Sequence, residues 1–230
     1  MTGKGSGRPI GSVSFLPDIA SGGRRDTNGL VSASDAVSST LILSRFVNEL
    51  QAKLAPVILD FGPAIGANVK FLGEQFGGFK LFVEDLLANL PLPSQPGGED
   101  EPEVTAPRLL YPNEGVDGIL CWDVLDYLGS KSGLMLAKEV VRVLRPGGVV
   151  LLCHGTETLS AAGPTGYEII DQNSLRYRFR SGVALRSRRV IQSGEVTRLF
   201  SSLTITDSIL LKSHMREVLL RKPSKLVAAG

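Results

Sequence analysis

The stretch VILDFGPAIGANV, residues 57–69, joins an apolar run to a turn of small residues and then to helical spacing. Three apolar residues come first, and Asp60 follows them directly. A short apolar run of this kind is typical of a strand that is buried on both faces. The small residues that follow let the backbone turn sharply and let a ligand approach the main chain. They are Gly62, Ala64 and Gly66.

A helix is predicted directly after this turn. Val69, Leu72 and Phe76 fall at i, i+3 and i+7, which places them on one face of a helix. The stretch therefore predicts a strand, a glycine turn and a helix in succession. In open α/β sheets, ligands bind at the carboxyl ends of the strands, so we expect a small-molecule site at this turn.

The same alternation of strand and helix signals continues along the chain. Further apolar runs lie at 79–86, 119–122 and 149–153. A helical stripe precedes the last run, and the sequence RPGG at 145–148 is expected to turn the chain. The stripe consists of Leu134, Ala137, Val141 and Leu144. This pattern predicts an α/β fold, a three-layer, doubly wound, mostly parallel sheet of the Rossmann-like type.

Different patterns are found on either side of this core. A helix is predicted from Ser34 to about Leu54, before the first strand. Near the other end, Ser193 is expected to cap a short helix that runs through Phe200. Two β-rich runs follow and predict an antiparallel edge hairpin that turns at 212–214.

Composition indicates one principal domain. The chain has 230 residues, 43% of them hydrophobic and 21% charged, which is enough for one sizeable core. We expect a flexible leader over 1–33, a domain over 34–222 and a short tail over 223–230. The net charge of +2 makes no case for nucleic-acid binding. No window reaches the roughly 18 consecutive apolar residues of a membrane span, so we expect no membrane partner.

Cysteine and histidine usage indicates the compartment and argues against a metal site. Cys121 and Cys153 each lie in a predicted buried strand, which favours packed, reduced thiols and a cytoplasmic location. Two histidines and two separated cysteines do not form a ligand set of recognisable spacing, so we expect no metal.

Several segments, in order, resemble the class I S-adenosylmethionine-dependent methyltransferases. ILDFGPAIG resembles the glycine-rich first motif of that family, and VED at 83–85 stands where the family ends its second strand with a ribose-binding acid. VDGILCWDVLDYL and KEVVRVLRPGGVVLLC resemble its fourth strand, the following helix and its fifth strand. The resemblance covers roughly residues 40–222, and its specificity lies in the ordered set of motifs.

The resemblance implies S-adenosylmethionine as the cofactor and assigns roles to particular residues. Asp60 would orient the loop and meet the cofactor's ammonium group through water, while the three small residues Gly62, Ala64 and Gly66 would face its methionine part. Either Glu84 or Asp85 would accept the ribose hydroxyls. We prefer Glu84 because it directly follows the apolar run.

The resemblance also indicates where methyl transfer would occur. Trp122 and Asp123 follow the fourth strand, where the family presents groups to the transferred methyl group, and Trp122 would contact the cofactor. Asp123 is a candidate catalytic residue, or alternatively a helix cap. His154 ends the fifth strand and is either a general base or a residue at the rim of the site. The implied activity is methyl transfer to a small-molecule acceptor, governed mainly by positioning.

Two departures from the family pattern support a different interpretation. Ala64 stands in place of the usual middle glycine. The acidic, proline-rich segment 90–107 covers the region of the family's third strand, so we transfer no adenine contact to this chain. A non-catalytic scaffold that binds a cofactor or a partner is therefore the alternative.

Two further patterns leave alternatives open. Tyr127 and Lys131 have the Tyr-x-x-x-Lys spacing of short-chain dehydrogenases, but Gly129 lies between them, and we interpret the match as accidental. In the segment 175–189, Arg176, Arg178 and Arg180 share one face of a strand and aromatic residues share the other. We favour a structural role, in which the arginine face is solvated and the aromatic face is packed. The alternative is that the arginines bind an acidic or phosphate-bearing substrate or RNA.

Overall fold

The structure is a computed structural model that describes residues 37–89, 108–157, 165–180 and 188–224. The predicted leader, the acidic segment 90–107 and most of the predicted tail lie outside the described residues.

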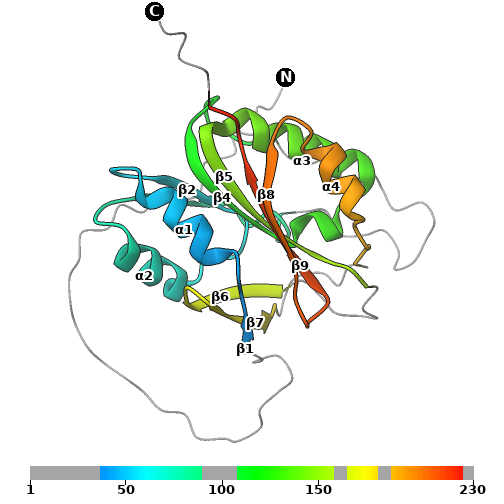
Figure 1. Cartoon of the computed structure of the whole chain (residues 1–230), viewed down its shortest axis with the longest axis horizontal. Coiled ribbons are helices and arrows are strands. Elements are labelled where there is room, and N and C mark those ends of the chain that lie inside the picture. The colour runs from blue at the N-terminus through cyan, green and yellow to red at the C-terminus, as the bar shows by residue number, and fades with distance from the viewer. Residues whose placement is uncertain (1–36, 90–107, 158–164, 181–187, 225–230) are drawn as a thin grey trace, which may run out of the picture.

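The core is a six-stranded sheet in the order β3-β2-β4-β5-β9-β8 (Figure 1). The four strands from β3 to β5 are parallel, and β9 is antiparallel to both of its neighbours. The strands are β2 (Val57–Asp60), β3 (Lys80–Val83), β4 (Val116–Trp122), β5 (Leu144–Gly155), β8 (Thr204–Leu210) and β9 (Met215–Arg221). The predicted mostly parallel sheet and its antiparallel C-terminal hairpin are confirmed, with β8 as the edge strand.

Helices cover both faces of this sheet and make the predicted three layers. On one face, α1 and α2 pack over a core that includes Phe46 and Leu72. On the other face, α3 and α4 pack over a core that includes Val140 and Leu199. The helices are α1 (Leu43–Gln51), α2 (Gly66–Gln75), α3 (Ser130–Val143) and α4 (Ser193–Leu199), and a short 3₁₀ helix, η1 (Val124–Tyr127), follows β4.

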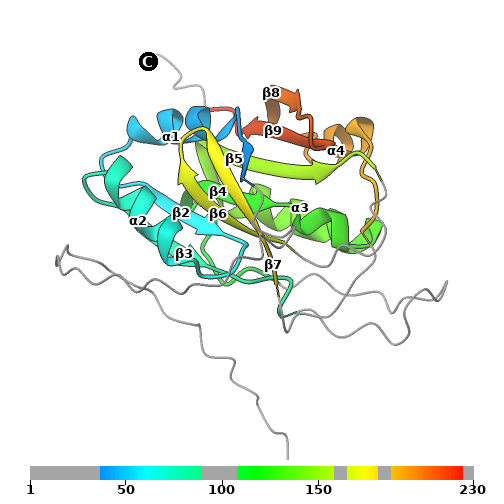
Figure 2. The ribbon, with the colours of Figure 1, turned by 90° about the horizontal axis from the view of Figure 1, so that it is seen from below.

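A second, smaller sheet has three antiparallel strands in the order β1-β7-β6. Its strands are β1 (Val37–Ser39), β6 (Thr165–Asp171) and β7 (Ser174–Phe179). Its apolar side chains, such as Tyr167 and Leu175, join the core under α1 and α2. Figure 2 shows this sheet crossing in front of the main sheet, on the side of α2. We refer to β1, β6 and β7 together as the small sheet.

The predicted helix before the core is shorter than expected. Residues 37–39 form β1 because they pair with β7, and helix α1 begins only at Leu43. The helix ends at Gln51, so Leu54, where the predicted helix was expected to end, lies outside it and is 99% exposed. The conformation of residues 37–39 depends on pairing with a strand far along the chain, and the spacing of apolar residues contains no sign of that pairing.

The predicted stripe of α3 is also displaced around the helix. Ala137 is buried as predicted, and Val141 packs against the core. Leu134, however, is 40% exposed, and Leu136 and Val140 are buried in its place. Leu144 is buried, but it is the first residue of β5 and does not belong to the helix. The helical period was correct, and the face that the sheet covers lies about one residue further round.

Two predicted local signals have a different role in the structure. RPGG was expected to turn the chain between the helix and the next strand, but it belongs to β5, where the register with β4 shifts and Gly147 has a φ of 75°. That backbone conformation favours glycine. Ser193 is the first helical residue of α4, and Gln192 occupies the cap position without a side-chain cap bond.

Two other predictions, the buried stripe of α2 and the packed thiols, are confirmed. Leu72 and Phe76 are buried along α2, and Cys121 and Cys153 are buried free thiols in β4 and β5. Burial raises the pKa of both thiols, which keeps them protonated and packed. No helix among the described residues is both long and apolar enough to cross a membrane.

Candidate functional site

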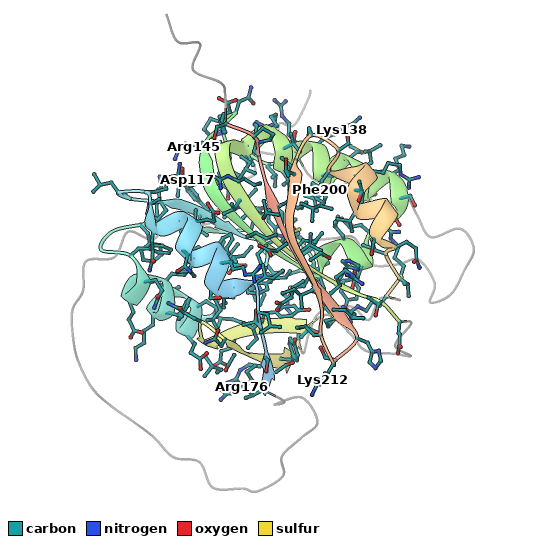
Figure 3. All side chains as sticks on the ribbon, viewed as in Figure 1. Asp117, Lys138, Arg145, Arg176, Phe200 and Lys212 are labelled. Carbon is teal, nitrogen blue, oxygen red and sulfur yellow. The ribbon has the colours of Figure 1, made fainter. Side chains whose placement is uncertain are left out.

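The predicted site residues gather at one edge of the main sheet. β2 ends at Asp60, β3 at Val83, β4 at Trp122 and β5 at Gly155. Because these strands are parallel, their carboxyl ends meet at the same edge. In Figure 3, Asp117 and Arg145 lie near the starts of β4 and β5, at the far end of the main sheet from these carboxyl ends. Arg176, on the small sheet, is labelled on the opposite side of the picture.

Asp60 is a buried carboxylate held by neutral donors. Its exposure is 2%. Its Oδ1 accepts hydrogen bonds from the Gly62 amide at 2.8 Å and from the Trp122 indole Nε1 at 2.7 Å. Asn68 contributes a further side-chain hydrogen bond. Burial outweighs these donors and raises the pKa of Asp60 to about 6, so the site favours a cation beside this carboxylate.

An irregularity in β4 aims the Trp122 side chain at Asp60. The register between β4 and β5 shifts between Leu120 and Trp122, and Trp122 has a φ of 49°. A bulky residue rarely adopts this left-handed conformation, and such outliers occur at functional sites. The indole stacks on the Tyr167 ring with centroids 4.8 Å apart and an interplanar angle of 2°, and Tyr177 meets Tyr167 edge-on at 5.3 Å.

The small residues of the loop after β2 serve different purposes. A Cβ on Gly62 would lie 3.1 Å from both Asp60 Oδ1 and the Trp122 ring, so the protein's own packing requires glycine there. A Cβ on Gly66, at the start of α2, would meet no heavy atom of the described residues within 4 Å. Ala64 and Gly66 are exposed. The part of the loop open to a ligand is therefore its second half, beside the N-terminus of α2.

The two candidate ribose-binding acids are partly buried and already hydrogen-bonded. Glu84 Oε2 accepts a hydrogen bond from the Tyr111 hydroxyl at 3.1 Å. The backbone amide of Glu84 donates to the Asp60 carbonyl at 2.7 Å, which places Glu84 next to the end of β2. Asp85 forms an ion pair with Arg180, which follows β7. The preference for Glu84 over Asp85 stays a prediction.

Asp123 does not act as a helix cap. It precedes η1 without a side-chain cap bond, and it is 1% exposed. Its Oδ2 lies 3.6 Å from the Arg188 guanidinium, and its side chain is hydrogen-bonded to Tyr127 and Tyr167. Burial raises the pKa of Asp123 despite the nearby guanidinium.

Asp126 completes this cluster. Arg188 Nε donates to its Oδ2 at 2.7 Å, and the Gly155 amide donates to the same oxygen at 2.8 Å. Burial and the neighbouring Asp123 raise the pKa of Asp126 to about 7, although Arg188 opposes the shift. This buried group can gain or lose a proton near neutral pH.

His154 is not a rim residue, because its exposure is 0%. Val150 and Leu152 belong to the core under α3 and α4, so strand alternation places His154 on that face of β5. Trp122 belongs to the opposite core, under α1 and α2. Burial lowers the pKa of His154 and favours its neutral form. The structure thus separates His154 from the carboxylate–indole contact of Asp60 and Trp122.

Sequence reasoning missed four residues that complete this edge. Three of them, Asn68, Asp126 and Arg188, lie within stretches that the sequence analysis singled out, but they were not selected for this site, and Tyr167 comes from outside those stretches. Asn68 had a usable signal, because a polar residue on the first turn of α2 follows the glycine loop directly. Tyr167 and Arg188 lie about 100 and 60 residues from their partners, and no local pattern could reveal them.

The basic segment is largely neutralised within the chain. Arg176, labelled in Figure 3, and Arg178 both form ion pairs with Glu168 on β6. Tyr177 packs on Tyr167 on the other side of the strand. These contacts agree with the preferred interpretation, in which the arginine face is solvated and the aromatic face is packed.

The structure does not bring Tyr127 and Lys131, the residues with the dehydrogenase-like spacing, into a common site. Tyr127 is buried and hydrogen-bonded to Asp123, while Lys131 is exposed on α3. The described residues also contain no group of three or more His, Cys, Asp or Glu side chains placed to hold a metal ion.

Comparison with known proteins gives structural neighbours of low sequence identity. No family model and no curated protein matches the chain. A methyltransferase from Mesorhizobium loti, described as S-adenosylmethionine dependent, is 14% identical and has a TM-score of 0.47 over 77% of this chain and 96% of its own. The sheet order and the three layers of the structure itself confirm the predicted Rossmann-like, mostly parallel architecture.

Two further structures show the same likeness of fold. A methyltransferase from Aquifex aeolicus is 13% identical, with a TM-score of 0.46 over 78% of this chain and 88% of its own. The 1,6-didemethyltoxoflavin-N1-methyltransferase of Burkholderia thailandensis is 18% identical, with a TM-score of 0.45 over 79% of this chain and 78% of its own. That enzyme was solved with 1,6-didemethyltoxoflavin and S-adenosylhomocysteine bound.

Proposed function

We propose that the chain is an S-adenosylmethionine-dependent methyltransferase that acts on a small-molecule acceptor. The observation that carries the proposal is Asp60, a buried carboxylate at the end of a parallel strand, held by neutral donors and followed by a glycine loop. A buried carboxylate without a compensating charge favours a cationic ligand. The amino group and the sulfonium of S-adenosylmethionine provide such charge.

The residues present fit this cofactor in part of the site. Gly66 opens α2 without an obstructing neighbour, so the N-terminus of that helix can receive the cofactor's carboxylate. Glu84 and Asp85 lie at the end of the neighbouring strand, where a carboxylate can accept ribose hydroxyls. When bound, S-adenosylmethionine would supply an electrophilic methyl group.

The remaining roles concern the acceptor. The chain's main task in an in-line transfer is to hold the acceptor in line with the methyl group and to exclude water. Asp123 lies beside Trp122 and can receive the acceptor's proton at its carboxylate, and its negative charge is felt by Asp126, whose pKa it raises. His154 remains the second candidate for a base, and it fits this role less well because it faces the other core.

The surroundings of the site favour a small-molecule acceptor over nucleic acid. The arginines of β7 and Arg180 already have carboxylate partners, so they do not form an open basic ridge. The two packed thiols, Cys121 and Cys153, are consistent with a reducing cytoplasm.

A non-catalytic scaffold is the second candidate, and a specific observation favours it. Trp122 and Asp60 are each 2% exposed, because the indole and the carboxylate satisfy one another. A chain with this contact permanently closed would keep the fold and lose the cofactor.

Calorimetric titration with S-adenosylmethionine and S-adenosylhomocysteine tests the proposal. Gly66→Arg is the variant of choice, because Gly62→Arg would clash with Asp60 and Trp122 and disturb folding. Gly77→Arg is the matched control, since Gly77 is exposed and a Cβ there also meets no described atom within 4 Å.

We expect saturable binding to the native protein, a loss of at least about tenfold in affinity for Gly66→Arg, and native affinity for Gly77→Arg. The absence of binding to the native protein would reject the methyltransferase and favour the scaffold. Equal binding by all three proteins would move the cofactor away from this loop.

A further inference from the structure

The small sheet touches the carboxyl edge of the main sheet at several points. Tyr167 on β6 stacks on Trp122 at the end of β4. A Cβ on Gly166 would lie 3.5 Å from Pro63, so β6 also lies against the loop after β2. Figure 2 shows β6 and β7 crossing over this side of the molecule.

Asn68 connects β6 to the first turn of α2. Its Nδ2 donates to the Tyr167 carbonyl at 2.9 Å, and its Oδ1 accepts from the Ile169 amide at 2.8 Å. The side-chain amide thus bonds to β6 as a neighbouring strand would. Because Asn68 also bonds to Asp60, one side chain joins the small sheet to the candidate cofactor loop.

Arg180 makes a further connection, at the end of β3. Its guanidinium pairs with Asp85, one of the two candidate ribose acids, and the two side chains are 10% and 24% exposed. A ligand that uses Asp85 must compete with Arg180 for the carboxylate.

The contacts at Asp60 show why the small sheet matters for binding. Asp60 is 2% exposed, and its Oδ1 is bonded to the Trp122 indole that stacks on Tyr167, so a ligand that bonds to this oxygen must displace the indole. Trp122 also has a left-handed backbone conformation, an outlier of the kind found at switching sites.

We propose that the end of the small sheet that carries Tyr167 and Arg180 is a lid over the cofactor edge, latched by the Arg180–Asp85 ion pair and positioned by Asn68. The Trp122–Tyr167 stack separates before a ligand reaches Asp60, while Ile169 and Leu175 stay packed in the core. The role at a cofactor site rests on the proposed function. Arg180 and Asn68 are then positioning residues. They set the fraction of molecules in which the lid is open, and this fraction sets the apparent affinity for the ligand.

Trp122 is the only tryptophan of the chain, so its fluorescence reports directly on the lid. The first measurement is acrylamide quenching without ligand, on the native protein and on Arg180→Gln. Arg176→Gln is the matched control, because Arg176 pairs with Glu168 inside the small sheet. Asp85→Asn removes the same latch from the other side, and melting curves show that each variant is folded.

We expect the quenching constant to rise about threefold to fivefold in Arg180→Gln and Asp85→Asn and to stay native in Arg176→Gln. Equal quenching in all four proteins would overturn the lid. So would a rise in Arg176→Gln equal to that in Arg180→Gln, because it would show general loosening of the small sheet.

The second measurement titrates the native protein and Arg180→Gln with S-adenosylhomocysteine while Trp122 emission is followed. We expect a red shift on binding, because the indole leaves its stack, and a several-fold higher affinity for Arg180→Gln. Binding without a change in emission would overturn the lid and leave the proposed function intact. Latch-dependent quenching without binding to either protein would reject the proposed function and retain the lid.

Discussion

Asp60 and the Asp123–Asp126 pair lie at neighbouring strand ends, and they are compensated in different ways. Asp60 receives hydrogen bonds from an indole, a backbone amide and a side-chain amide, all of them neutral. Asp123 and Asp126 share the guanidinium of Arg188. Burial raises the pKa of all three carboxylic acids, to about 6 for Asp60 and about 7 for Asp126.

The difference separates a cluster that carries its own cation from a carboxylate that lacks one. The Asp123–Asp126 pair has its cation within the chain, so it anchors η1, β5 and the segment at Arg188 in addition to the role proposed for Asp123. Asp60 has donors but no full positive charge among these bonded partners, which is the arrangement that an incoming cation would complete. Removing a charge should therefore have opposite effects at the two places.

The largest effect is expected for Arg188→Met, which removes the cation and leaves two buried carboxylates. We expect a loss of about 3–5 kcal/mol in the free energy of unfolding at pH 8, measured by urea denaturation. Without Arg188 the folded-state pKa values of both acids rise further above the unfolded values, so the folded protein binds protons more tightly. The loss should accordingly be smaller at pH 5 than at pH 8.

Arg189→Met is the control for this prediction. Arg189 pairs with Glu195, and the two side chains are 27% and 14% exposed. We expect this variant to lose about 1 kcal/mol and to show little pH dependence between pH 5 and 8. Losses of equal size in the two variants would show that the buried cluster is not compensated by Arg188.

A smaller effect of opposite sign is expected for Asp60→Asn. Because the folded-state pKa of Asp60 is raised to about 6 from an ordinary 3.8, the ionised form opposes folding. Stability from this group is therefore gained as the pH falls below about 6 and lost as the pH rises through it. At pH 8 we expect the amide to stabilise the protein by about 2 kcal/mol, with the gain disappearing towards pH 4.

Thermal denaturation of both proteins over pH 4–8 measures this difference. If Asp60→Asn is less stable than the native protein at pH 8, the ionised carboxylate is better compensated than the neutral donors indicate, and the proposed preference for a cationic ligand would fail with it.

The smallest effect is expected for Trp122→Phe, which retains a stacking ring and loses the indole N–H. The pKa of Asp60 should rise above about 6, because the ionised carboxylate loses one of its donors. The cost at pH 8 should be about 1 kcal/mol. Tyr177→Phe changes the same aromatic cluster without touching Asp60, and a carboxyl titration followed by NMR should show a native pKa there. An unchanged pKa in Trp122→Phe would contradict the assigned contact.

Much of the fold could be predicted because it depends on neighbouring residues. The loop after β2, the helix α2 and the C-terminal hairpin each arise from spacing within a few residues. The candidate acids at the ends of β2 and β3 could also be selected, since a carboxylate directly after an apolar run must lie at a strand end.

The errors concern segments whose state depends on a distant partner. Residues 37–39 form a strand because β7 pairs with them, and the buried face of α3 depends on where the sheet meets it. Tyr167 covers Trp122 only because the small sheet folds back across the edge. Local periodicity contains no information on such contacts.

The sequence by itself determined the order of strands and helices around the main sheet, the glycine turn and the placement of acids at strand ends, because these follow from backbone preferences and local burial. The tertiary structure alone decided which of those acids is paired with an arginine, and which is covered by an aromatic side chain beside the exposed N-terminus of α2. Desolvation and charge pairing depend on residues that are remote in sequence, and these two effects determine whether a carboxylate supports the fold or can receive a ligand.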